Sequence, residues 1–306
     1  MAYRILVPLD GSSRAERAIL VVDRLAEAMN ADVEVLRVVD PADVLTTSTI
    51  AAAAPEILDS RARQAERYLD DAAKRFHRVQ VAATRVLQGT ASKTIAEHAC
   101  NTSFDLIVMA SHGQTGLVDA LLGSVARAVV RESAVPVLIL RERTALPQEV
   151  RGLNVIVPLD GSPVAEAVLT PLLPLARALD WRLRLLWVAD VRDEERGQET
   201  SPLAAQHARE ARPEMVAYLE RLAAGVRADG PAADVQIEAG DCAECIVRCA
   251  EPEDVDLIAI STHGRHGIGR LVLGSVTEHV MSHAGKPVLA IRPKGRPVLI
   301  HQKEKA

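Results

Sequence analysis

Aromatic side chains are scarce in this chain of 306 residues, of which they make up 2%. The core must therefore be aliphatic, and the chain lacks the aromatic platform on which single-stranded nucleic acid stacks. Positive charge is not in excess either, because 36 Lys and Arg stand against 41 Asp and Glu, for a formal net charge of −5. This balance excludes a global basic field for nucleic acid but leaves room for a small anion held by local groups.

Long apolar runs are also missing. Met1–Arg4 leads directly into Ile5–Val7, without the apolar stretch and cleavage site of a signal peptide. No run reaches the roughly 18 apolar residues that cross a bilayer. The four cysteines are too few for a disulfide framework. We therefore expect a cytoplasmic protein with no membrane partner.

An internal repeat organises the chain. Three segments occur twice in the same order, 150 or 151 residues apart: 5–12 and 155–162, 112–125 and 263–276, and 135–138 and 286–289. Each copy has the length of one domain. We predict two homologous domains, 1–142 and 152–294, joined through Arg141–Gly152, which contains Pro147 and charged residues.

Within each copy, short apolar runs alternate with longer segments of helical period. The predicted strands of the first copy are 4–8, 32–39, 79–87, 105–110 and 135–140. The predicted helices are 13–29, 55–77, 91–101 and 123–132. Runs such as Leu106–Met109 are apolar on both faces, as in parallel strands covered by helices on each side. The order predicts an α/β fold with two doubly wound, Rossmann-like domains.

The last strand of each copy follows a proline, Pro136 or Pro287. The strand 137–140 is too apolar for an open sheet edge, which would invite aggregation. We therefore expect the last strands of the two copies to pair with each other, as an intramolecular pseudo-dimer, or with a second chain in a homodimer.

Residues that directly follow strands are the candidates for a site, because doubly wound sheets bind ligands at the carboxyl ends of their strands. The first strand of each copy ends in Pro-Leu-Asp, at Pro8, Leu9 and Asp10 and at Pro158, Leu159 and Asp160. A Gly-Ser pair follows. Two interpretations stay open: these residues form a turn and a helix cap, or the carboxylate contacts ribose hydroxyls or a divalent metal.

A glycine-rich loop follows the fourth strand of each copy and ends where a helix begins. Such a loop offers backbone N–H groups and the positive end of a helix dipole, which suits phosphate. His112 and His263 either contact phosphate or have a structural role beside the glycines. The second copy has Arg265 where the first has Gln114, so its loop suits a triphosphate better.

Each copy resembles a universal stress protein domain. Nucleotide-binding members carry Gly-x-x-Gly, nine residues, and Gly followed by Ser or Thr; Gly113 and Gly123-Ser124 fit this spacing, as do Gly264 and Gly274-Ser275. The resemblance implies a five-stranded parallel sheet per domain and an ATP ligand with magnesium or manganese. The first glycine is replaced by Ala110 and Ser261. If that position needs a positive φ, the side chain costs about 1 kcal/mol or more.

The resemblance also implies which residues hold the nucleotide. Val38 and Val188, at the ends of the second strands, would contact adenine, or else belong to the strand core. The other implied residues are Pro8, Leu9, Asp10, Met109, Ala110, His112, Gly113, Gly123, Ser124 and Val125 in the first copy, and Pro158, Leu159, Asp160, Ser261, His263, Gly264, Arg265, Gly274, Ser275 and Val276 in the second.

The function expected from this resemblance is that of an ATP-binding regulator in a stress response. The alternative is a stress protein that binds no nucleotide and acts through protein–protein interaction. We do not expect an enzyme, because the loops lack the Gly-Lys-Ser/Thr ending of a P-loop and no catalytic constellation is evident.

Cys242, Cys245 and Cys249 share one face of the helix after the third strand, by their i, i+3, i+7 spacing. They form a stripe that faces the core, a redox-sensitive thiol group, or a zinc or iron–sulfur site. The sequence favours the first interpretation, because the aligned residues of the first copy are Ala91, Thr94 and His98 and no fourth metal ligand is evident.

Overall fold

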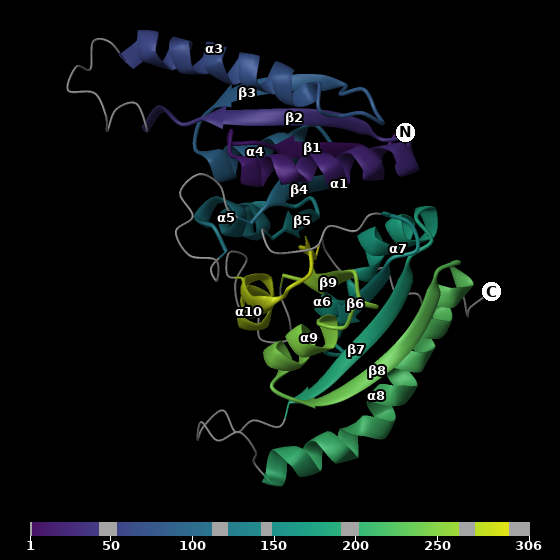
Figure 1. Ribbon diagram of the computed structural model, residues 1–306. Coiled ribbons are helices and arrows are strands. Elements are labelled where there is room, and N and C mark those ends of the chain that lie inside the picture. Colours follow the sequence, from purple (N-terminus) through teal and green to yellow (C-terminus); the bar gives the residue numbers. More distant parts are fainter. Residues whose placement is uncertain are drawn as a thin grey trace. The chain divides into compact units, whose positions relative to one another are not determined.

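The computed structural model describes residues 2–42, 54–111, 122–141, 149–190, 202–262 and 273–293. The chain divides into two compact units, Met1–Leu146 and Pro147–Ala306. In each unit, parallel strands alternate with helices along the chain (Figure 1). The predicted fold class, two doubly wound α/β units, is confirmed.

The first unit is a five-stranded parallel sheet. Its elements are β1 (Arg4–Pro8), α1 (Ser13–Met29), β2 (Asp32–Val39), α3 (Ala54–Ala73), β3 (Ala83–Gln88), α4 (Ala91–Asn101), β4 (Leu106–Ala110), α5 (Ser124–Glu132) and β5 (Val137–Leu140). The strand order is β3-β2-β1-β4-β5. The chain runs outward from β1 to β3 and returns to the other side of β1, so the switch point lies between β1 and β4.

The second unit has the same strand order. Its elements are β6 (Asn154–Pro158), α6 (Pro163–Glu166), α7 (Leu169–Ala178), β7 (Arg182–Asp190), α8 (Pro202–Ala228), β8 (Ala232–Gly240), α9 (Cys242–Ala250), β9 (Leu257–Ser261), α10 (Ser275–His283) and β10 (Val288–Ile291). The parallel strands lie in the order β8-β7-β6-β9-β10. The switch point therefore lies between β6 and β9.

One helix differs between the units. Where α1 is continuous, the second unit has α6 and α7, with a break around Ala167 and Val168. Pro171 has no N–H to donate to the carbonyl of Ala167 four residues back, and its ring crowds that carbonyl. The proline therefore fits in the first turn of a new helix and ends the previous one.

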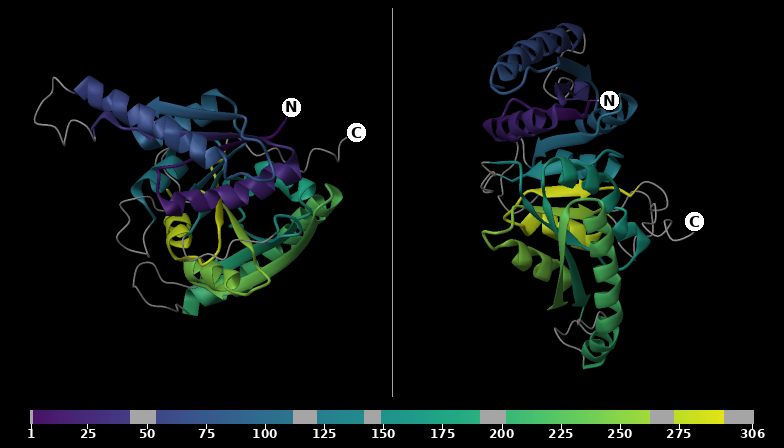
Figure 2. Two further views of the ribbon diagram at one scale, coloured as in Figure 1. Left: turned by 45° about the horizontal axis from the view of Figure 1, so that its top comes forward. Right: turned by 90° about the vertical axis from the view of Figure 1, so that its right-hand side faces the viewer.

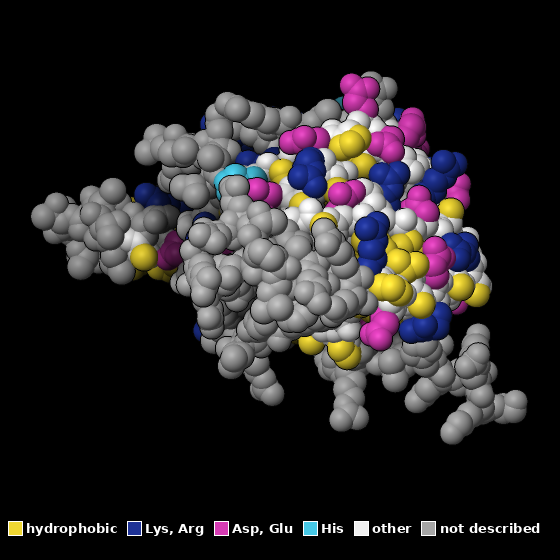
Figure 3. Space-filling view, turned by 90° about the horizontal axis from the view of Figure 1, so that it is seen from below, with side chains coloured by type: hydrophobic (Ala, Val, Ile, Leu, Met, Phe, Trp, Pro, Cys, Tyr) yellow, Lys and Arg dark blue, Asp and Glu magenta, His cyan; other side chains and the backbone are white. Residues whose placement is uncertain are grey.

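The interior of both units is aliphatic, as the scarcity of aromatic residues predicts. Ile5, Leu6 and Ile107 are fully buried in the first sheet, and Ile156 and Leu183 are at most 1% exposed in the second. Helices α8 and α9 both pack against β7 and β8, and Figure 2 shows the long green α8 running beside these strands. Among the side chains drawn in colour in Figure 3, acidic and basic ones are interspersed.

The largest departures from the predicted bounds occur in one strand and one helix. Strand β3 begins at Ala83 and not at 79, and α3 ends at Ala73 and not at 77. The cause is the carboxylate of Asp23 in α1, which accepts hydrogen bonds from the backbone N–H groups of residues 77, 78 and 79, at 3.0, 2.9 and 3.2 Å. The chain wraps around this carboxylate before the strand can start.

The pairing expected for the last strands stays a prediction. Within its own unit, β5 pairs with β4, and β10 pairs with β9.

None of the helices in the described ranges combines the length and apolar character that a bilayer crossing needs.

Asp23 is 6% exposed, so its contacts with residues 77–79 are shielded from water. Asp23→Ala leaves three backbone donors without their acceptor, and we expect the free energy of unfolding to fall by about 2–4 kcal/mol. Asp23→Asn, which keeps one acceptor oxygen, should lose less. Urea denaturation measures both variants, with the exposed Asp70→Ala as control. An Asp23→Ala variant as stable as the wild type contradicts this role.

Candidate functional site

The carboxyl ends of β1, β2 and β4 lie at one edge of the first sheet. The register pairs Pro8 with Leu36 on one side of the sheet and Ala110 with Leu140 on the other. In the second unit, Pro158 pairs with Leu186 at the corresponding edge. The topology thus brings the described candidates that follow the first, second and fourth strands to one edge of each sheet, beside the switch point.

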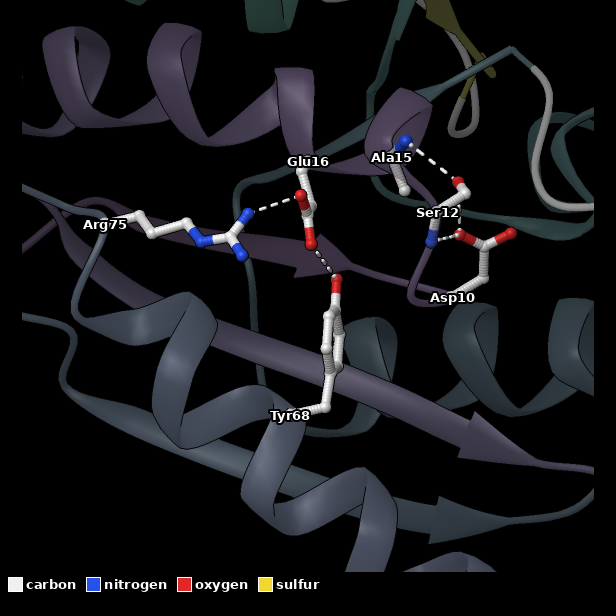
Figure 4. A network of polar contacts seen from close by, with 6 residues as sticks. All are labelled: Asp10, Ser12, Ala15, Glu16, Tyr68 and Arg75. Atoms are coloured by element: carbon white, nitrogen blue, oxygen red, sulfur yellow. Dashed lines mark hydrogen bonds and ion pairs between the residues drawn. The ribbon is translucent and has the colours of Figure 1, made fainter.

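Asp10 builds the turn that follows β1 (Figure 4). Its Oδ1 accepts hydrogen bonds from the backbone N–H of Ser12, at 3.0 Å, and from the Ser12 hydroxyl, at 2.6 Å. Ser12 Oγ in turn accepts from the N–H of Ala15, at 3.1 Å, and caps α1. Gly11, with φ of +87°, occupies the left-handed region between them. The turn-and-cap interpretation is therefore correct, and any ligand contact of Asp10 is additional to it.

The second unit repeats this turn. Asp160 Oδ1 accepts from the N–H of Ser162 at 2.8 Å, and Ser162 Oγ accepts from the N–H of Ala165 at 3.2 Å. Gly161 has φ of +79°. Each half-buried carboxylate is thus held at the carboxyl end of the central strand.

A second polar network beside this turn was not predicted. The Tyr68 hydroxyl donates to Glu16 Oε1 at 3.1 Å, and Arg75 pairs with the other oxygen of Glu16 (Figure 4). In the second unit, Tyr218 donates to Glu166 at 2.5 Å. Burial raises the pKa of the Tyr68 phenol, and the Glu16 carboxylate raises it further. The signal was available, because both residues of this pair recur 150 positions later.

Helices α5 and α10 begin without a side-chain cap. Each is preceded by a glycine, Gly123 or Gly274, whereas α1, α6 and α9 begin at a capping Ser or Asp. The N–H of Gly123 donates to the carbonyl of Ser111 at 2.8 Å, and that of Gly274 donates to Thr262 at 3.0 Å. These bonds fasten each helix start to the end of β4 or β9. First-turn N–H groups have no partner within a helix and attract anions there.

Ala110 and Ser261, which replace the first glycine of the motif, lie in extended backbone. They are the last residues of β4 and β9, and neither has a positive φ. The conformational cost that the sequence suggested therefore does not arise. The Ser261 hydroxyl donates to the carbonyl of Val164 at 3.2 Å, and Thr277 Oγ1 donates to the Ser261 carbonyl at 2.8 Å. Ser261 thus fastens β9 to α6 and α10.

The remaining candidates lie in strands, at helix starts or outside the described residues. Met109 and Val188 are buried strand residues, 7% and 9% exposed. Val38 is half-buried. Ser124, Val125, Ser275 and Val276 open α5 and α10. His112, Gly113, His263, Gly264 and Arg265 lie outside the described residues.

The cysteines of α9 differ in exposure. Cys245 and Cys249 are 1% and 8% exposed, while Cys242 is partly exposed at the first position of the helix. Burial raises the pKa of both buried thiols, although Arg248 opposes the shift. The core-facing stripe is therefore correct for two of the three. Within the described ranges, no three His, Cys, Asp or Glu side chains are grouped to hold a metal ion.

Fold and repeat define a class: doubly wound α/β proteins built from two copies of one domain. The model of the Universal stress protein family matches residues 1–141 and 153–292. The chain belongs to the universal stress protein family, and the predicted family is confirmed.

Relatives of known sequence or structure resemble the chain at full or half length. A universal stress protein of Mycolicibacterium smegmatis is 24% identical over 299 residues, which cover 95% of this chain and 98% of the relative. Universal stress protein YxiE of Bacillus subtilis is 30% identical over 149 residues, 46% of this chain and 100% of that protein. The crystal structure of a universal stress protein from Archaeoglobus fulgidus has a TM-score of 0.70 at 20% identity, covering 95% of this chain and 98% of that one. This last likeness shows the shared fold.

Two substitutions of Asp160 distinguish the hydrogen bond that its side chain accepts in the turn from the negative charge that it carries. Asp160→Ala removes the acceptor for the N–H of Ser162, and we expect the free energy of unfolding to fall by about 1–2 kcal/mol. Asp160→Asn keeps Oδ1 as acceptor and should lose about half as much or less. Urea denaturation followed by circular dichroism measures both. Equal losses in the two variants would rule out this turn as the reason for the destabilisation.

Proposed function

We propose that this chain binds ATP, with magnesium or manganese, at the carboxyl edge of each sheet and acts as a nucleotide-dependent regulator in a stress response. The observation that carries the proposal is the uncapped helix start, led by Gly123 in one unit and Gly274 in the other, beside the end of β4 or β9. The same arrangement in both units, and membership of the universal stress protein family, support it.

The residues present fit such a ligand. Ser124 and Ser275, exposed at the first position of α5 and α10, offer backbone N–H groups and a hydroxyl to phosphate oxygens. Asp10 and Asp160 offer hard carboxylate oxygens, which accept from ribose hydroxyls or bind the metal that neutralises phosphate charge. Half-buried Val38 offers an aliphatic surface to adenine.

The proposal is one of binding with little or no hydrolysis. The segments that lead to Gly123-Ser124 and Gly274-Ser275 have no lysine directly before the hydroxyl residue, so neither ends in the Gly-Lys-Ser/Thr of a P-loop. An ATP that is held and slowly turned over suits a regulator whose partners read the bound state.

The alternative is a stress protein that binds no nucleotide. The argument for it is that the first glycine of the motif is replaced in both copies. Ala110 and Ser261 are in ordinary extended backbone, so these side chains strain neither strand end. This observation favours retained sites over lost ones.

The number of sites can be counted with single substitutions. Gly123 and Gly274 have φ of −58° and −61°, so Gly123→Val and Gly274→Val add bulk at a helix start without a left-handed backbone. We expect about two ATP per wild-type chain by calorimetric titration, and a loss of tenfold or more in affinity at one site in each variant, about 1.4 kcal/mol. Gly285→Val is the control, because no atom lies within 4 Å of the added Cβ. Unchanged binding in both site variants contradicts the proposal, as does the absence of binding in the wild type.

The carboxylates can be tested by their charge alone. Asp10→Asn and Asp160→Asn keep the turn acceptor, and we expect each to weaken ATP binding in the presence of magnesium by about tenfold at its own site. Titrations with and without magnesium measure the effect, and phosphate release is followed in parallel. Unchanged affinity would limit these carboxylates to the turn, and rapid turnover abolished by Asp160→Asn would make the protein an enzyme.

A further inference from the structure

The first turn of α9 brings two thiols to the carboxyl end of the second sheet. The thiol of Cys242 donates to the carbonyl of Val188 at 3.8 Å and to Oδ2 of Asp190 at 3.7 Å, both on β7. The thiol of Cys245 donates to the carbonyl of Ala239 on β8, at 3.7 Å. Strands β7 and β8 are neighbours in this sheet. The two sulfur atoms therefore lie over the ends of adjacent strands.

Helix geometry places this pair within reach of a disulfide. Residues three apart in an α-helix have Cα atoms about 5 Å apart, by the rise of 1.5 Å and turn of 100° per residue, and disulfides span about 4.4–6.8 Å between Cα atoms. The Cβ atoms must approach by about 1–2 Å. Cys242 is the first residue of α9, where the N–H has no partner within the helix. Its movement therefore breaks no helical hydrogen bond in which Cys242 is the donor.

The surroundings give the two thiols different roles. Cys242 is partly exposed at the first position of α9, where the helix dipole favours an anion, and its thiol is hydrogen-bonded to Asp190. Cys245 is buried against Gly240, where an added Cβ would lie 2.8 Å from its sulfur. Burial raises the pKa of the Cys245 thiol, while Arg248 Nη2 donates to its sulfur at 3.2 Å. Cys242 is thus placed to attack and Cys245 to resolve.

We propose that Cys242 and Cys245 form a redox-active dithiol that takes a small disulfide, of the oxidised glutathione class, as its oxidant. The Cys242 thiolate attacks one sulfur of this disulfide and forms a mixed disulfide, and one glutathione thiolate leaves. Cys245 loses its proton to water and attacks the Cys242 sulfur, and the second glutathione leaves. Two protein thiols and one glutathione disulfide become one protein disulfide and two glutathione thiols. The protein gives up two electrons.

The dithiol belongs to the second unit alone, because Ala91 and Thr94 occupy these positions in the first. Its consequence for the ligand rests on the proposed function. Val188, whose carbonyl accepts from Cys242, is the expected adenine contact of the second site. Closing the disulfide draws Cys242 away from this carbonyl, so ATP affinity should change with redox state at the second site and stay constant at the first.

Peptide mapping tests the dithiol directly. The full chain is equilibrated with mixtures of oxidised and reduced glutathione, free thiols are alkylated, and the protein is cut with trypsin. Cleavage after Arg227, Arg248 and Arg265 leaves Cys242 and Cys245 together in 228–248 and Cys249 in 249–265. We expect an internal disulfide in 228–248 that is absent from Cys242→Ser and Cys245→Ala and kept in Cys249→Ser and Cys100→Ser.

Other maps overturn the proposal. These are complete alkylation of peptide 228–248 in oxidising buffer, a glutathione adduct without ring closure, and a bridge between 228–248 and 249–265. Because the wild-type map decides between them, the result does not depend on the folding of any variant.

A titration tests the coupling to the nucleotide. Gly123→Val leaves the second site, and its affinity for ATP should differ by about fivefold or more between oxidised and reduced protein. The difference should vanish when Cys245→Ala is added. Equal affinities in both redox states overturn the coupling. If the reduced wild type binds no ATP, the proposed function fails, and the peptide map still decides the dithiol.

Discussion

The place of the first strand between the second and fourth is the constraint on which each unit depends. All strands are parallel, so their carboxyl ends share one edge, and the chain must leave the central strand on one side and return on the other. The two connections diverge at this edge. The Asp-Gly-Ser turn then starts α1 or α6 at once, while a glycine starts α5 or α10 beside the fourth strand. A carboxylate and a helix start therefore border the switch point in each unit.

Much of this architecture could be predicted because it is encoded locally. Strands β1 and β2 and helix α1 have the predicted bounds, since period and caps lie within the segments themselves. The start of β3 could not be predicted in this way. It is set by Asp23, which meets residues 77–79 from more than fifty positions away in the chain. The helical period of the apolar residues also did not predict the break between α6 and α7, although Pro171 lies in the first turn of α7.

The candidate site likewise has features that the sequence predicts and features that it does not. Strand ends and glycine-led helix starts follow from the order of motifs, so their place at one edge was predictable. The backbone at Ala110 and Ser261 was not, because a motif position does not state its φ, and the expected strain is absent. The pair of Tyr68 with Glu16 joins α3 to α1, and only its recurrence as Tyr218 with Glu166 could have revealed it.

Duplication explains why the two units share one strand order and differ in individual side-chain contacts. Glu34 on β2, 5% exposed, accepts from His98 at 2.6 Å and from Arg85 at 3.2 Å. The corresponding Arg184 on β7 pairs with Asp254 at 3.1 Å and lies 3.8 Å from Asp234. The sign of the charge is reversed, yet both charges are paired, which the buried Glu34 requires. Positions whose partners change together can diverge without disturbing the turn and helix starts. The first turn of α9 also differs, with Cys242 and Cys245 where the first unit has Ala91 and Thr94, while both units keep a glycine-led helix start after the fourth strand.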